Sequence, residues 1–209
     1  MSVNNIVNMA KLKGLDVIVL TDHNSCKNCP PFMAVAANAG LRAIPGMEIN
    51  TSEEVHAVCL FKDLAAAMEF DSYVHSRLPD IANREDLFGE QLLLDEQDNV
   101  IGRERKLLIN AAGISFFDLR ELMEGYNGIY FPAHIDRNSF SLISNLGFVP
   151  DGCIMDAFEL TDPADSKGLL ERNPVLKNLP ALKNSDAHHL WDISEAVNEL
   201  PHQFFGPVL

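Results

Sequence analysis

The chain has 209 residues, of which 47% are hydrophobic and 22% charged, and its formal net charge is -14 at pH 7. This composition predicts one folded domain over residues 1–209. The excess of acid argues against a surface for long nucleic acid, because such binding depends on many Lys and Arg side chains that neutralise phosphates. We therefore expect a small substrate. No apolar run is long enough to cross a membrane and no signal-peptide pattern opens the sequence, which favours a cytoplasmic protein without a membrane partner.

Helix and strand patterns alternate along the chain. Ser2 is a candidate N-cap for a helix that ends at Gly14, and the β-branched run at 16–20 predicts a buried strand. Further helices are predicted over 32–39, 64–74 and 116–124, and further strands over 41–48, 55–61, 128–131, 154–160 and 181–184. This alternation is typical of an α/β fold.

The regular pattern loosens between about residues 76 and 110, where Pro, Asn, Asp and charged residues accumulate. The apolar segments at 91–94 and 99–101 flank an acidic turn there, which predicts a hairpin. We interpret 76–110 as an insertion in the single domain.

Side chains that can bind metal lie at or near the ends of four predicted strands. Because the carboxyl ends of parallel strands gather on one face of an α/β fold, we expect these side chains to converge. Asp186 and His188 are two positions apart, so on a strand they would face the same way. Mixed carboxylate and imidazole ligands suit Zn, Mn or Fe. The candidate ligands are Asp22, His23, Glu48, His56, His134, Asp186 and His188.

The same residues carry a resemblance to the PHP (polymerase and histidinol phosphatase) domain family, a family of metal-dependent phosphoesterases. Four motifs occur in the family's order: Thr21-Asp22-His23-Asn24, Gly46-Met47-Glu48, Pro132-Ala133-His134 and Ser185-Asp186-Ala187-His188-His189. The resemblance implies a distorted (β/α)7 barrel with two or three divalent metals at the ends of its strands.

One part of the family pattern is missing from this sequence. The family's opening strand carries a His-x-His pair, whereas no histidine precedes His23 here. The resemblance implies that Glu48 bridges metals, with His56 and His134 at one metal, Asp186 at another, and His23 with His188 at a third. Without the first strand, we expect an exposed sheet edge that favours a homo-oligomer, and a form with weak activity.

This ligand set predicts the hydrolysis of a small phosphomonoester or a short phosphodiester, with Glu48 and Asp186 in catalytic positions. Arg137 follows His134 by three residues, and its planar guanidinium would suit a substrate phosphate. Alternatively, Asp136 and Arg137 form a surface ion pair. His189 and Glu159 are either supporting residues of the site or structural ones.

Two other functions fit part of the sequence. Cys26 and Cys29 form a Cys-x-x-Cys pair between a strand and a helix, where a thiol redox site could lie. A binding module of the same fold that has lost its catalytic activity is the other alternative, and it would retain little metal.

Overall fold

The computed structural model describes residues 1–150, 152–162, 166–201 and 204. A four-stranded sheet lies at its centre, in the order β1 (Val17–Leu20), β2 (Arg42–Asn50), β3 (His56–Leu60) and β6 (Ile129–Pro132). Strand β2 is parallel to β1, whereas β3 is antiparallel to both β2 and β6. Strands β1, β2 and β6 therefore run in one direction and β3 runs in the other.

Strand β2 lies in the interior of the molecule, and every residue from Ile44 to Asn50 is buried. Its side chains alternate between two apolar clusters, as the period of a strand requires. Met47 and Ile49 pack with Phe70 on the side of helix α3 (Leu64–Arg77). Ile44 packs on the opposite side with residues of β3 and β6. Glu48 occupies this second face, so its carboxylate is buried in the interior of the fold.

Two helices cover the β1 side of the sheet. Helix α1 (Val3–Leu12) buries Val3, Val7 and Ala10, which share one helical face, against α2 (Cys29–Asn38). Ser2 is the N-cap of α1 as predicted, but its hydroxyl donates to Asp98 instead of capping the helix. At the opposite edge of the sheet, α5 (Leu119–Gly125) packs against β6.

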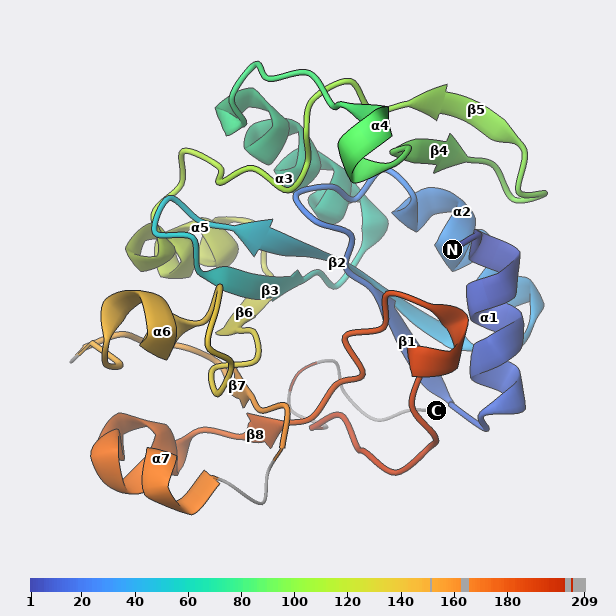
Figure 1. The fold of residues 1–209 in the computed structure, drawn as a ribbon. Coiled ribbons are helices and arrows are strands. Elements are labelled where there is room, and N and C mark those ends of the chain that lie inside the picture. Colours follow the sequence, from blue (N-terminus) through green and yellow to red (C-terminus); the bar gives the residue numbers. More distant parts are fainter. Residues whose placement is uncertain (151, 163–165, 202–203, 205–209) are drawn as a thin grey trace.

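The predicted hairpin of the 76–110 segment is confirmed. Strands β4 (Leu92–Leu94) and β5 (Val100–Arg103) pair antiparallel, and the short helix α4 (Glu85–Phe88) precedes them. The hairpin lies beside α2 and the start of α1 (Figure 1), where the Asp98 carboxylate also accepts a hydrogen bond from the Asn4 amide. That this segment is an insertion in a single domain stays a prediction.

The C-terminal part has shorter elements than the sequence predicts. Besides the helices η1 (Phe116–Asp118), α6 (Leu142–Leu146), α7 (Ser166–Arg172), η3 (Pro174–Asn178) and η4 (Leu190–Asp192), it contains a parallel pair of strands, β7 (Phe158–Glu159) and β8 (Ala181–Leu182). Only part of the predicted 154–160 strand forms, because the Asp156 carboxylate accepts from the Tyr130 amide in place of regular strand pairing.

Backbone hydrogen bonds continue the strand series from β6 to β7. The Asp156 amide donates to the Tyr130 carbonyl, and the Ile135 amide donates to the Glu159 carbonyl. The α/β class predicted from the sequence is therefore confirmed. None of the helices in the described part of the chain has both the length and the apolar character that a membrane span requires.

Gly46 of β2 offers a test of how tightly the central strands pack. A Cβ atom at this position would lie 2.8 Å from Leu60 Cδ2 and 2.9 Å from Thr21 Cγ2. We expect Gly46→Ala to lower the free energy of unfolding by about 1–3 kcal/mol, because the added methyl overpacks this site. Chemical denaturation measures the change.

Gly168 of α7 is the matched control, since a Cβ there would meet nothing within 4 Å. Gly168→Ala should leave stability unchanged or raise it by up to about 1 kcal/mol, because alanine favours the helix. Equal stability of the Gly46→Ala variant and the wild type would contradict the close packing of β1, β2 and β3.

Candidate metal centre

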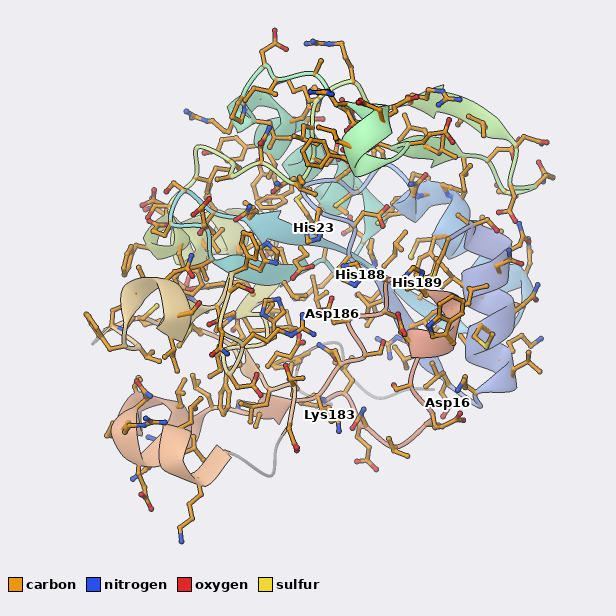
Figure 2. All side chains as sticks on the ribbon, viewed as in Figure 1. Asp16, His23, Lys183, Asp186, His188 and His189 are labelled. Atoms are coloured by element: carbon orange, nitrogen blue, oxygen red, sulfur yellow. The ribbon has the colours of Figure 1, made fainter. Side chains whose placement is uncertain are left out.

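An open pocket of about 190 Å³ lies at the ends of β1, β2 and β6. Figure 2 shows His23, Asp186 and His188 near one another in front of the sheet, whereas Asp16 and Lys183 lie away from them. The lining residues are His23, Glu48, His56, His134, Arg137, Ser139, Phe140, Asp186 and His188. The structure thus brings together six of the seven candidate ligands, and Arg137 with them.

The Glu48 carboxylate is the centre of this pocket. It is 6% exposed. One oxygen, Oε1, lies 3.1 Å from His56 Nδ1 and 3.4 Å from His134 Nε2, and the other, Oε2, lies 3.6 Å from His23 Nδ1. Burial acts to raise the pKa of Glu48, but the hydrogen bonds from His134 and His56 and the nearby His23 outweigh it and hold this pKa well below its usual range.

The direction of β3 explains why His56 reaches Glu48. Residues 51–55 connect the end of β2 to the start of β3, and the antiparallel register pairs Asn50 with His56. The end of β2 and the start of β3 therefore lie side by side. His134 joins them because β6 is antiparallel to β3, so that Pro132 pairs with Ala57 beside His56. Convergence at strand ends is as expected for β1, β2 and β6, whereas His56 comes from the beginning of its strand.

The donor atoms fit a metal ion. Ligand atoms of His23, Glu48 and His56 all lie within 4.8 Å of one another. In addition, the buried Nδ1 atoms of His23 and His134 have no hydrogen-bond partner. Buried polar atoms without partners are costly and rare, and a ligand that accepts or shares their lone pairs removes that cost. Imidazole and carboxylate together form a typical site for Zn, Mn or Fe.

The pKa values of two histidines beside Glu48, His134 and His23, are shifted in opposite directions. Burial acts to lower the pKa of His134, but the hydrogen bond and charge of Glu48 raise it above the usual value. For His23, burial lowers the pKa and outweighs the attraction of Glu48, and His56 lowers it further. Glu48 therefore favours a proton on His134, whereas burial favours the neutral form of His23 that a metal requires.

Asp186 and His188 lie in a coil after β8, not on the strand that their spacing suggested. Asp186 has a φ of +46°, and its carboxylate accepts a hydrogen bond of 2.6 Å from Arg137 Nη1. His188 Nδ1 lies 2.9 Å from the Asp186 carbonyl oxygen. Two residues of one coil thus reach the pocket through local backbone turns. The proposed Asp136–Arg137 ion pair is not observed, since the Asp136 carboxylate accepts from the Thr161 and Asp162 amides instead.

Asp22 and His189, which the sequence suggested for the site, lie outside the pocket lining. The Asp22 carboxylate accepts a hydrogen bond from the Asn28 side chain, and burial raises its pKa. Asp22 and His23 are adjacent in the chain, so their side chains point to opposite sides, and Asp22 points away from the histidine cluster. His189 stacks on Trp191, with ring centroids 4.8 Å apart.

Glu159, which the sequence left undecided, is a buried carboxylate beside the site. It is 3% exposed, and Asn184 Nδ2 donates to its Oε2 at 2.9 Å. Burial raises its pKa to about 7, against the opposing hydrogen bond from Asn184 and the charge of His134. Its place at the end of a short strand was the only sequence signal. Its burial depends on contacts distant in the chain.

The thiol pair lacks the environment of a redox site. Cys26 and Cys29 are both buried, and both Sγ atoms point to the Gly46 carbonyl oxygen, at 3.2 and 3.6 Å. The hydrogen bond with Cys29, together with burial, raises the pKa of Cys26 well above its usual value. Reactive cysteines instead have lowered pKa values and partial exposure. The geometry therefore disfavours the thiol redox alternative.

Comparison with known proteins identifies the family. The profile of the PHP domain family matches residues 1–116, which are more than half of the 209-residue chain. The chain belongs to the PHP domain family. A search of curated proteins found no significant match.

Solved structures support the same fold over nearly the whole PHP chain. A putative metal-dependent phosphoesterase from Bifidobacterium adolescentis is 16% identical with a TM-score of 0.59, and the alignment covers 98% of this chain and 87% of that one. An amidohydrolase from Chromobacterium violaceum, solved with bound sulfate and no metal, is 16% identical with a TM-score of 0.61, and 100% and 89% are covered. These neighbours confirm the predicted fold of the PHP family, a distorted (β/α) barrel.

The lesion-specific endonuclease PfuEndoQ from Pyrococcus furiosus shares this fold as well. It is 19% identical with a TM-score of 0.60 over 91% of this PHP chain, which spans 44% of the endonuclease chain. Endonuclease Q has also been solved with a 27-mer duplex that carries an abasic lesion at the active site. The exclusion of long nucleic acid, drawn from net charge, was therefore wrong, because this fold is compatible with a DNA duplex at its active site.

The pH dependence of stability tests the buried state of Glu159. Its pKa is about 7 in the folded protein and near 4.5 when unfolded, so the folded state binds the proton more tightly. The free energy of unfolding should then fall as pH rises from about 4.5 to 7, by up to about 3 kcal/mol. Glu159→Gln should remove this fall, and urea denaturation in the presence of EDTA at pH 5 and pH 8 measures it.

The exposed Glu121 provides the control, since Glu121→Gln should leave the pH dependence unchanged. Suppose instead that the Glu159→Gln and wild-type proteins lose the same stability between pH 5 and pH 8. Glu159 then does not hold a proton in the folded protein at pH 5, and the raised pKa assigned to it is wrong.

Proposed function

We propose that this PHP domain is a metal-dependent phosphoesterase that hydrolyses a small phosphomonoester or a short phosphodiester. The family and the fold support a metal-dependent hydrolase. The choice of a phosphoester as the substrate goes beyond this support and is our proposal. The observation that carries it is the buried Glu48 carboxylate, contacted by three imidazoles and open to solvent through a pocket that also contains Arg137.

The residues that would hold metal are the candidate ligands in the pocket. Glu48 and His56, with His23 or His134, offer the most complete set of donors, and Asp186 and His188 would complete a second or third position. Zn, Mn and Fe all suit this combination. A bound divalent metal supplies Lewis-acid chemistry, which makes water more acidic and stabilises negative charge on a phosphoester.

The arginine would orient the phosphate. Arg137 lines the pocket beside the candidate ligands and donates a hydrogen bond to the Asp186 carboxylate. A guanidinium can hold two phosphate oxygens at once through parallel N–H bonds. Because Arg137 is only three residues from His134, the same loop that supplies a ligand would position the substrate.

His188 is the candidate for proton transfer at the mouth of the pocket. A carbonyl oxygen only accepts hydrogen bonds, so the contact between His188 Nδ1 and the Asp186 carbonyl places the proton on Nδ1. The Nε2 lone pair is then free to bind metal or to take a proton from water. Either role requires the ring orientation that the Asp186 carbonyl fixes.

A nucleic-acid phosphodiester is a second candidate substrate. The likeness to endonuclease Q favours it, since that protein binds a DNA duplex at its active site. Hydrolysis of a phosphodiester within a duplex would use the same metal ligands, and only the surface around the pocket would differ. A substrate panel should therefore include duplex DNA with and without an abasic site.

Replacement of Glu48 tests the proposal. Glu48→Gln keeps the size of the side chain but removes the anion, so we expect at least about a 100-fold loss of metal affinity and loss of phosphoesterase activity. Metal content by elemental analysis, the rise of Tm on addition of Mn²⁺ or Zn²⁺, and hydrolysis of the substrate panel measure these effects. EDTA should abolish wild-type activity, and added metal should restore it.

Glu69→Gln, an exposed glutamate of α3, is the control and should behave as the wild type. If Glu48→Gln retains both metal and turnover, the carboxylate is not a ligand and the proposed centre is wrong. If the wild type retains little metal and hydrolyses neither phosphate esters nor DNA, the chain is a binding module of this fold that has lost its catalytic activity.

A further inference from the structure

Phe140 is the one apolar side chain among the described residues that line the pocket. The other lining residues are ionisable or hydroxyl-bearing, and all of them except Ser139 belong to the proposed centre. Phe140 is 43% exposed. An apolar ring that is half-exposed in a polar site provides surface that an apolar part of a substrate can cover.

The backbone holds Phe140 in an unusual conformation. Its φ is +52°, a left-handed value that is uncommon for a bulky aromatic residue. The His56 amide donates to the Phe140 carbonyl at 2.9 Å. Ser141, the next residue, caps helix α6 through Ser144 and donates to the Arg137 carbonyl. These contacts hold the backbone on both sides of the Phe140 side chain, and a strained backbone of this kind often marks a functional position.

The ring of Phe140 stacks on the ring of His56, with centroids 4.7 Å apart and an interplanar angle of 19°. One face of the phenyl ring thus covers a candidate ligand. Because Phe140 is partly exposed and lines the pocket, part of its surface is open to a substrate there. Arg137, on the same loop, lies where it can hold a phosphate. Arg137, the proposed phosphate contact, and Phe140, the apolar contact, are therefore only three residues apart on one loop.

We infer that Phe140 determines specificity, by packing against a flat, ring-bearing group on the alcohol side of the phosphoester. This inference rests on the proposed function and names the substrate class within it. Aromatic pairs favour offset or edge-to-face contacts that contribute beyond simple burial. A substrate with a ring should therefore bind more tightly than one with a short alkyl group of the same charge.

The test compares two non-hydrolysable phosphonates, benzylphosphonate and ethylphosphonate, by calorimetry on the Mn²⁺-loaded wild type and the Phe140→Leu variant. We expect the wild type to bind benzylphosphonate up to about tenfold more tightly. Phe140→Leu should lose this preference while ethylphosphonate binds within about twofold of the wild type. Phe148→Leu replaces another exposed phenylalanine, outside the pocket, and should retain the preference.

Matched esters extend the test to catalysis, because benzyl phosphate and ethyl phosphate both release primary alcohols. Phe140→Leu should raise KM for benzyl phosphate selectively. Equal losses for both compounds would overturn the inference, since Phe140 would then only position His56. Equal affinity of the wild type for both phosphonates would overturn it too. Phosphonate binding without hydrolysis would reject the proposed function alone.

Discussion

The burial of one carboxylate organises the rest of the site. Glu48 lies on the central strand of the sheet, where both neighbouring strands shield it from water. An ionised carboxylate in such a position is unfavourable unless hydrogen bonds and opposite charges stabilise it. His56 and His134 supply these hydrogen bonds. His56 and His134 are also candidate metal ligands, so protons and metal ions would compete for their ring nitrogens.

The topology of the sheet makes this assembly possible. A short β2–β3 connection places His56 next to Glu48, and the antiparallel β3–β6 pair adds His134 from a strand more than 70 positions later in the chain. The loop after His134 then contributes Arg137, Ser139 and Phe140. The candidate ligand His134, the proposed phosphate contact of Arg137 and the pocket wall at Phe140 therefore all depend on the pairing of β3 with β6. A shift of that register would displace all three.

Much of this arrangement could be predicted from local sequence, because apolar runs mark strands and polar residues after them mark their ends. Glu48 and His134 were identified in this way. The direction of β3 could not be predicted from residues 55–61 alone, since a short apolar run has the same pattern in a parallel or an antiparallel pair. Glu159 was also undecidable, because its burial depends on packing between segments distant in the chain.

Phe140 shows a different limit of sequence reasoning. A phenylalanine in a polar loop gives no periodic signal, and its role depends on a left-handed backbone angle and a stack on His56. Both features arise only when β3 and the loop after β6 meet. Residues that shape specificity are more often found in loops than in regular elements, so the sequence motifs point to the chemistry of the site and not to its substrate.

Net charge is a poor guide to partners for a related reason. The value of -14 sums the whole chain, whereas a phosphate responds to the groups within about a Debye length, roughly 8 Å at physiological ionic strength. Glu48 and Asp186 face Arg137 and four histidines in the pocket, and each bound divalent ion would add two positive charges. With metal bound, the local field would favour a phosphate even though the surface as a whole is acidic, and it would do so whether the phosphate belongs to a small ester or to a nucleic acid.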